Sequence, residues 1–135
     1  MAYWFLKSEP GSYPFARLRQ EGRAVWDGIR NPQALMHVRT MQRGDQALFY
    51  HTGAEKAVVG VVRIDSAPYA DPGAADPKLA VVDVVPDRAL ERPVTLAQLK
   101  ADAAFRTLGL VRQPRLSVGP VTAEEWRRIL RLSGG

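Results

Sequence analysis

Short apolar runs alternate with helix-like segments along the sequence, and turn-forming residues separate them. The apolar runs are rich in aromatic and β-branched side chains, a pattern typical of strands. Gly60 lies inside one of these runs, and a glycine within a strand indicates a bulge or a close approach to the backbone. Five strands are predicted in this way, at 2–7, 46–52, 57–65, 79–85 and 115–121.

Four helices are predicted from residues that begin or end a helix. Ser12 is the expected N-cap of the first helix, and Gly22 its end. Asn31 is the expected cap of the second, with Pro32 at its first position and Gly44 closing it. The other two begin with the Thr-x-x-Gln/Glu pattern of a capping box, at Thr95–Gln98 and Thr122–Glu125.

Together these elements predict a single α+β domain over residues 1–135, built as a mixed β-barrel with peripheral short helices. A chain of 135 residues is long enough to bury a core. The segment 67–77 holds three prolines, which predicts a surface loop outside the barrel.

The composition limits where the protein works. The chain has no Cys, which excludes disulfides and thiolate metal sites. Its apolar N-terminal run ends after five residues, at Lys7, which predicts a strand rather than a signal peptide. No stretch approaches the roughly 20 apolar residues of a membrane span. The expected location is the cytoplasm, with no membrane partner.

The net charge of +5 is unevenly distributed. Residues 1–51 carry seven bases against four acids and 101–135 six against three, whereas 52–100 carry six bases and seven acids. If the two basic ends meet in the fold, they form a face suited to a polyanion. A second explanation stays open, because fifteen of the nineteen bases are Arg, as a GC-rich bacterial genome would produce without any phosphate contact.

Residues that support catalysis or metal binding are sparse. The two histidines, His37 and His51, are too scattered for a metal site, and His37 is expected at the surface of a helix. Neither a G-x-S-x-G motif nor a phosphate-cradling glycine loop occurs. Glu9 and Asp27 could form an acid pair, but twelve other acids compete with them. The sequence therefore predicts no catalytic residue, no metal and no cofactor.

Polar residues stand instead at the ends of the apolar strands. In a barrel, strand ends converge at a mouth, where concave pockets form. One set is Lys7, Ser8 and Glu9 after the first strand. The others are His51 and Thr52, which follow Phe49 and Tyr50, and Arg115 and Ser117, which flank Leu116.

The segment "WDGIRNPQA" (26–34) is expected as an insertion between helices near this mouth. Trp26 supplies a π-face, Asp27 an acceptor, and Asn31 and Gln33 both donors and acceptors. These groups would stack on a planar heterocycle and bond its edge. The alternative is structural: Trp26 is a core residue, Asp27 begins a turn, and Asn31 only caps the helix. We favour the cap for Asn31 alone and the pocket for the group.

Six stretches carry a resemblance to a known family. They are "YWFLKSEP" (3–10), "WDGIRNPQA" (26–34), "MQRGDQALFYHTG" (41–53), "AVVGVV" (57–62), "PVTLAQLK" (93–100) and "RLSVGPVTAEEW" (115–126). In this order they resemble the EVE domain, whose fold is similar to the PUA fold and which is related to the YTH readers of methylated adenine.

The resemblance implies a PUA-like barrel with a pocket for a flipped, often modified base, such as a methylated or hydroxymethylated cytosine. The matching residues expected to form the base pocket are Lys7, Ser8, Glu9, Trp26, Asp27, Asn31, Gln33, Tyr50, His51, Leu116 and Ser117. Those expected to contact phosphates are Lys7, Arg30 and Arg115.

One stretch departs from the family's pattern. Many members have Tyr, Arg and Asn where this chain has Pro32, Leu35 and Met36. Pro32 suits a helix start, so the fold is not affected, but contacts from the three missing side chains are lost. The identity of the base therefore does not follow from the resemblance.

Two classes of function remain. The first is a non-enzymatic reader of a modified base in DNA or RNA, and the partner is then a nucleic acid that carries the base. The second is a nucleic-acid hydrolase on a PUA-like fold, with Lys7 or His51 in an acid–base role. A monomer is favoured, although the sequence does not determine the oligomeric state.

Overall fold

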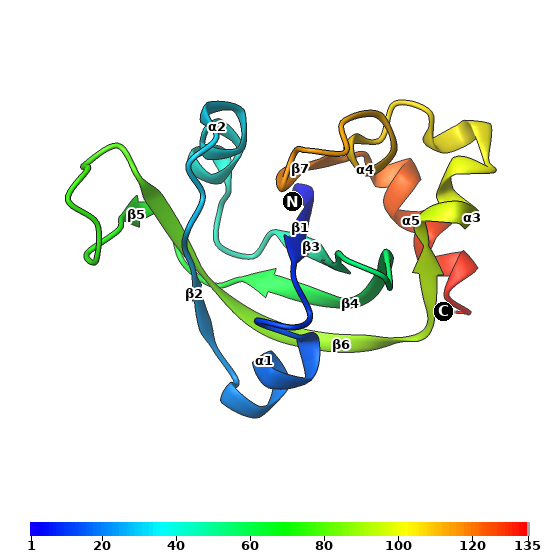
Figure 1. Cartoon of the computed structure of the whole chain (residues 1–135), viewed down its shortest axis with the longest axis horizontal. Coiled ribbons are helices and arrows are strands. Elements are labelled where there is room, and N and C mark those ends of the chain that lie inside the picture. Colours follow the sequence, from blue (N-terminus) through cyan, green and yellow to red (C-terminus); the bar gives the residue numbers. More distant parts are fainter. Residues whose placement is uncertain (135) are drawn as a thin grey trace.

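The computed structural model describes residues 1–134 and consists of one curled mixed sheet with short helices around it (Figure 1). The sheet order is β2-β6-β4-β3-β1-β7, and β5 pairs with β6 outside this path. β1 and β3 are parallel, and the other pairs are antiparallel. The strands are β1 (Tyr3–Ser8), β2 (Ala24–Trp26), β3 (Gln46–His51), β4 (Ala57–Ile64), β5 (Tyr69–Ala70), β6 (Ala80–Thr95) and β7 (Val118–Val121).

The helices lie at the rim and on the outside of this half-barrel. α1 follows β1, α2 packs against β7 and β6, and α3 to α5 gather at the far end of β6 (Figure 1). Within residues 1–134, none of the helices is long and apolar enough to cross a membrane. The helices are α1 (Phe15–Glu21), α2 (Pro32–Thr40), α3 (Leu96–Lys100), the 3₁₀ turn η1 (Ala103–Phe105), α4 (Gly109–Arg112) and α5 (Ala123–Leu132).

The predicted α+β class and the single curled sheet are confirmed, with all five predicted strands in it. Four parts of the strand prediction are wrong. The last strand begins at Val118 rather than at Arg115. Residues 24–26 form the unpredicted strand β2, which pairs with β6, so Trp26 ends a strand instead of beginning an insertion. β6 continues to Thr95, ten residues beyond the predicted end. The loop 67–77 contains the short strand β5, which pairs with β6 at Val81 and Ala80.

Helix ends follow the predicted caps, with two exceptions. Gly44 does not close α2, because the helix ends at Thr40 and Met41 after it has an extended backbone. The Asn31 side chain accepts from the Ala34 amide at 3.0 Å, and both capping boxes form. The other exception is Ser12, which lies in a turn, because α1 begins only at Phe15. Pro14 has an extended backbone and disfavours a helical conformation of the residue before it, so the helix starts after it.

Gly60 has both features expected of a glycine within a strand, a bulge and a close approach of another group to its backbone. The register of β4 against β3 and β6 shifts next to it, which is a bulge. A Cβ built on Gly60 would also lie 2.5 Å from Cζ of Phe15. The first side chain of α1 therefore packs directly on the backbone of β4.

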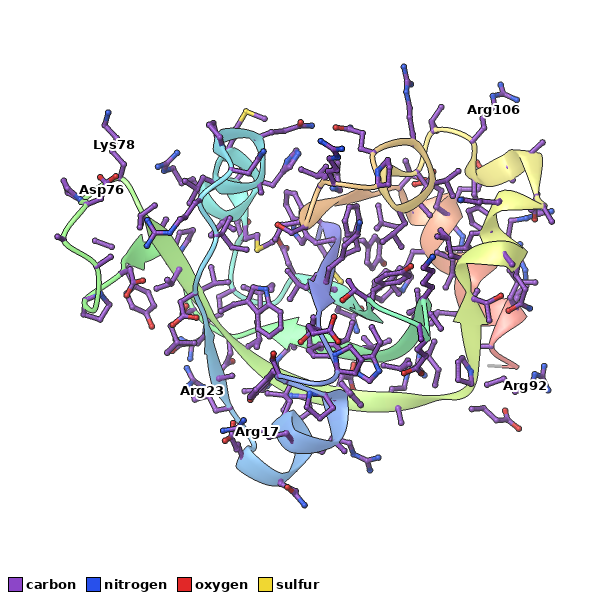
Figure 2. The ribbon with its side chains drawn as sticks, viewed as in Figure 1. Arg17, Arg23, Asp76, Lys78, Arg92 and Arg106 are labelled. Carbon is purple, nitrogen blue, oxygen red and sulfur yellow. The ribbon has the colours of Figure 1, made fainter. Side chains whose placement is uncertain are left out.

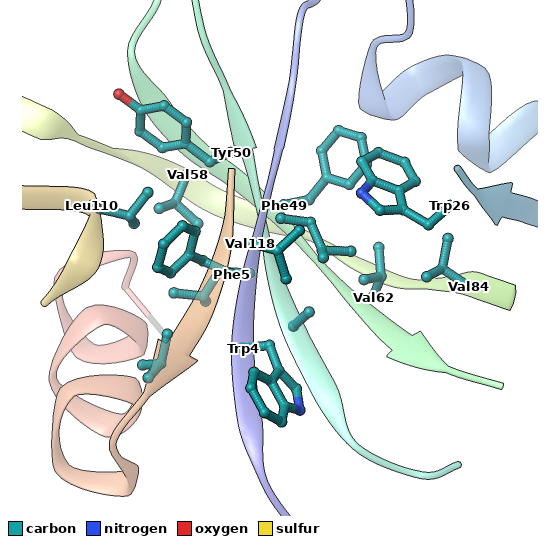
Figure 3. Close-up of a cluster of buried hydrophobic side chains, with 14 of the residues drawn as sticks. Trp4, Phe5, Trp26, Phe49, Tyr50, Val58, Val62, Val84, Leu110 and Val118 are labelled. Carbon is teal, nitrogen blue, oxygen red and sulfur yellow. The ribbon is translucent and has the colours of Figure 1, made fainter. Parts of the chain in front are cut away.

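The core lies inside the curled sheet and between it and the helices. β1 and β3 are central strands, and both are buried almost along their whole length. Figure 3 shows Phe5 and Val118 at the middle of this core, with Tyr50 and Leu110 on one side. On the other side the indole of Trp26 lies beside the ring of Phe49.

We expect Gly60→Ala to lower the free energy of unfolding by about 1–3 kcal/mol, because the added methyl overlaps a buried ring that has no room to move. Urea unfolding followed by far-UV circular dichroism measures this. Gly73→Ala is the matched control: its added Cβ meets ordinary contact distances, with 3.5 Å to Asp71 Oδ1. Equal losses in the two variants would contradict the close approach of Phe15.

Candidate functional site

A cavity of about 470 Å³ opens where β1 and β2 end. The loop after β1 and the last residue of α1 complete its wall. The residues that line it are Lys7, Ser8, Glu9, Tyr13, Glu21, Ala24, Val25, Trp26 and Asp27.

Aromatic rings form one wall of the cavity and continue into the core. Tyr13 meets the Trp26 ring edge-on at a centroid distance of 6.2 Å, and Trp26 meets Phe49 edge-on at 5.5 Å. Phe49 in turn contacts Phe15, at 5.2 Å. Trp26 is only 9% exposed, so it is at once a core side chain and part of the cavity wall. The core position of Trp26 is therefore confirmed, and its contact with a bound base stays a prediction.

Hydrogen bonds hold the loop that carries Tyr13. The Tyr13 amide donates to the Glu9 carbonyl at 2.8 Å, and the hydroxyl of buried Ser8 donates to the Tyr13 carbonyl. Ser8 is therefore occupied by the backbone of the loop. Its role is to position Tyr13 at the cavity.

His51 fixes the start of α1 through a hydrogen bond to Phe15. Its Nε2 accepts from the Phe15 amide at 3.0 Å, so Nε2 carries no proton and Nδ1 carries it. Nδ1 then donates to Glu55 Oε1 at 2.9 Å. His51 is among the predicted pocket residues, but within the described chain it lies behind the cavity wall and not in it.

Tyr13 is oriented by its charged neighbours. Its hydroxyl donates to Glu21 Oε1 at 2.6 Å, and the Arg17 guanidinium lies 5.3 Å from the ring centroid. Burial, together with the Glu21 carboxylate, raises the pKa of Tyr13 to about 12. The same hydrogen bond lowers the pKa of Glu21. At neutral pH the pair is thus a phenol that donates and a carboxylate that accepts.

Three carboxylates surround the cavity, and they differ in their partners. Glu21 accepts from Tyr13, and Glu9 accepts from Thr52 Oγ1 at 3.2 Å. Asp27 is exposed and makes no hydrogen bond or ion pair within residues 1–134. Of the three, Asp27 is the acceptor that a bound molecule can use.

Lys7 separates this cavity from two smaller hollows. Its Nζ donates to the Pro114 carbonyl at 2.7 Å and lies 5.8 Å from the Tyr50 ring centroid. Partial burial lowers the pKa of Lys7. One hollow, of about 250 Å³, includes Lys7, Tyr50 and Pro114. The other, of about 330 Å³, is lined by Asn31, Gln33, Gln113, Pro114, Arg115 and Leu116.

The structure thus divides the predicted pocket. Lys7, Ser8, Glu9, Trp26 and Asp27 line the main cavity. Tyr50 lies in the smaller hollow next to Lys7, and Asn31, Gln33, Arg115 and Leu116 lie in the hollow beyond Pro114. Of the others, the Ser117 carbonyl accepts from the Lys7 amide at 3.0 Å, and Arg30 is exposed on the segment between β2 and α2.

Tyr13 and Glu21 are cavity residues that the sequence prediction missed. Both fall in the segment predicted as one helix from Ser12, where Tyr13 would be an ordinary helical residue. The signal that identifies Tyr13 is Pro14, which moves the helix start and leaves Tyr13 in a loop.

The second histidine is also more buried than predicted. His37 is half-buried on α2, 5.9 Å from the Trp4 ring, and burial lowers its pKa. Its Nε2 has no hydrogen-bond partner among residues 1–134. The predicted surface position of His37 is therefore wrong.

A curled half-barrel with an aromatic cavity at its mouth defines the class of PUA-like domains, and comparison with known proteins identifies the family. The EVE domain family matches residues 2–132. The chain therefore belongs to the EVE domain family. Mouse thymocyte nuclear protein 1 is 32% identical over 96% of this chain and 73% of its own length.

Solved structures agree with this assignment. A Rhodopseudomonas palustris protein solved by NMR is 40% identical, with a TM-score of 0.94 over 99% of this chain and 94% of its own. The human THYN1 protein in complex with 5-methylcytosine-containing DNA is 27% identical, with a TM-score of 0.91 over 100% and 99%. An ASCH protein from Zymomonas mobilis, at 14% identity and a TM-score of 0.62 over 97% and 95%, shares the fold alone. The predicted PUA-like fold is confirmed.

We expect His51→Ala to destabilise the protein by about 1–3 kcal/mol, because the buried Phe15 amide loses its acceptor. Thermal and urea unfolding measure the loss. His37→Ala serves as the control, since it removes a half-buried ring without breaking a hydrogen bond to Nε2. A stability of His51→Ala equal to that of the wild type would contradict the structural role of His51.

Proposed function

We propose that this protein binds nucleic acid and holds one modified base, flipped out of the strand, in the cavity beside Trp26. The observation that carries the proposal is the combination of two aromatic side chains with a carboxylate that lacks a partner, Asp27, in one cavity. Support comes from the relative human THYN1, whose structure contains 5-methylcytosine DNA.

The energetics of base flipping set what the cavity must supply. Extruding a base costs a few kcal/mol, and one aromatic contact returns roughly 1–3 kcal/mol. Trp26 is mostly covered by its neighbours, so Tyr13, which is half-buried, shares the contact with the base. Hydrogen bonds to the edge of the base supply the remainder, and they are stronger where water is excluded.

Asp27 favours a base with an exocyclic amine. An ionised carboxylate only accepts hydrogen bonds, so an amine donates to it while a carbonyl is repelled. The other two cavity carboxylates already accept from Tyr13 and Thr52. The preferred ligands are therefore amino bases such as modified cytosines.

The remaining predicted residues have proposed roles around this base. Arg30 and Arg115 are exposed and suit contacts to phosphates, which add affinity without sequence information. Asn31, Gln33 and Leu116 suit a contact with a neighbouring nucleotide in the hollow beyond Pro114. Binding to RNA as well as DNA stays a prediction. The cytoplasmic location and the bacterial origin of the protein also stay predictions.

A reader that performs no chemistry is the better of the two functions considered. The hydrolase alternative gives an acid–base role to Lys7 or His51. Both ring nitrogens of His51 are bonded, and Lys7 Nζ donates to a backbone carbonyl. Neither group is poised to take a proton from a nucleophile, so nothing supports the alternative.

Incubation with modified oligonucleotides, with and without divalent metal, tests this directly, and a reader leaves the strand intact.

We expect Trp26→Phe to weaken binding of a 5-methylcytosine oligonucleotide about tenfold, because the smaller ring covers less of the base. Fluorescence anisotropy measures the affinity, and melting curves check the fold. Trp126→Phe is the matched control, since Trp126 on α5 is also buried but stacks on Tyr3, at a centroid distance of 4.5 Å. The proposal fails if the two variants lose affinity equally.

We expect Asp27→Asn to keep affinity for 5-methylcytosine but to lose discrimination against thymine. The two bases both carry the methyl group. They differ at the amine or carbonyl that faces Asp27, and at N3, which accepts in 5-methylcytosine and donates in thymine. An amide can bond to either the amine or the carbonyl. Titrations with a matched pair of oligonucleotides measure the ratio of the two affinities.

The control is Asp76→Asn, which removes the same charge on the loop between β5 and β6, at the far edge of the molecule (Figure 2). Unchanged discrimination in Asp27→Asn would remove Asp27 from the base edge.

A further inference from the structure

Lysines are concentrated around one hollow of this protein. The chain has only four lysines among its nineteen bases, and three of them, Lys7, Lys56 and Lys100, line the hollow of about 250 Å³ beside the main cavity. They come from three distant parts of the sequence: the end of β1, the turn between β3 and β4, and the end of α3. The hydroxyl-bearing side chains of Tyr50 and Thr52 line the same hollow.

The positive charge in this hollow is not neutralised by the protein. None of its lining residues is acidic, and none of the ion pairs among residues 1–134 includes one of the three lysines. The nearby carboxylates have other partners. Glu55 accepts from His51 Nδ1, and Glu9 accepts from Thr52 Oγ1.

The backbone places Lys56 at this position. Lys56 has a φ of 47°, a left-handed conformation that only glycine adopts without strain. Its carbonyl accepts from the Leu96 amide at 2.8 Å, which joins the β3–β4 turn to the first residue of α3. The same contact fixes the turn with Lys56 against the helix that ends at Lys100.

Lys7 connects the hollow to the main cavity, because its side chain lines both. The bond from Nζ to the Pro114 carbonyl uses one of three donors, so two remain for a ligand. A nucleotide has its base and its phosphates on opposite sides of one sugar. A base in the main cavity therefore brings a neighbouring phosphate to this hollow.

From this arrangement we propose that Lys7, Lys56 and Lys100 form a binding site for the backbone phosphate next to the flipped base. The proposal rests on the proposed function. Lysine binds phosphate as a point charge and suits a hollow that receives a single anion. Sequence reasoning assigned Lys7 to phosphate together with Arg30 and Arg115, and it did not find Lys56 or Lys100.

The test uses the double variant Lys56→Gln/Lys100→Gln with single-stranded oligonucleotides that carry 5-methylcytosine or cytosine at the same place. We expect affinity to fall roughly tenfold for both strands, and the slope of log K against log salt to fall by about 0.7 for one lost phosphate contact. The preference for the modified strand remains, because the main cavity is intact.

Lys78→Gln is the matched control. Lys78 is the fourth lysine of the chain, and Figure 2 shows it at the far side of the molecule, on the loop before β6. We expect little change in affinity from its loss. An equal loss per removed charge in the control and in the double variant would mean that only net charge matters, and would overturn the proposal.

An uncharged methylphosphonate linkage in the oligonucleotide shows which backbone phosphate the lysines bind. We expect a methylphosphonate at one of the two linkages next to the modified base to weaken wild-type binding, with no further loss in the double variant. Additive losses at both linkages would overturn the site.

The proposed function fails separately, if the wild-type protein binds modified and unmodified strands equally. A loss in the double variant confined to the modified strand would move Lys56 and Lys100 into base recognition and also overturn the phosphate site.

Discussion

The packing of Phe15 on the bare backbone of Gly60 is the constraint on which the cavity depends. A side chain at Gly60 would displace the ring, and the bulge beside Gly60 shapes the strand around it. The amide of Phe15 donates to Nε2 of His51, which fixes the start of α1. With α1 fixed at its first residue, the loop before it is short and tied, and it carries Tyr13 to the edge of Trp26. The wall of the cavity is thus produced by contacts in the core.

Because the cavity wall is part of the core, a change in the wall also changes the stability of the fold. Trp26 contacts Phe49, which contacts Phe15, so a change in the cavity is transmitted to the packing of α1. Preorganised aromatic walls reduce the entropy that a flipped base must overcome on binding. The same coupling explains why truncating Trp26 to Ala is a poor probe of function, since large-to-small changes in a core cost about 3–5 kcal/mol.

The sequence predicts the sheet and the caps well, because these depend on local patterns. It also predicts that Lys7, Ser8, Glu9 and Asp27 meet at a mouth, since strand ends converge in a barrel. It does not predict that the bond from Lys7 to Pro114 divides the mouth, since this contact joins residues that are 107 positions apart. Nor does it reveal Tyr13, whose place depends on how one proline shifts the start of a helix.

The three residues that depart from the family's pattern all lie on α2. Pro32 stands at its first position, Leu35 is 6% exposed and packs in the core, and Met36 is 52% exposed. A buried leucine where many members carry arginine converts a position suited to polar contacts into one that packs the helix against the sheet. In this chain Leu35 therefore packs α2 into the core.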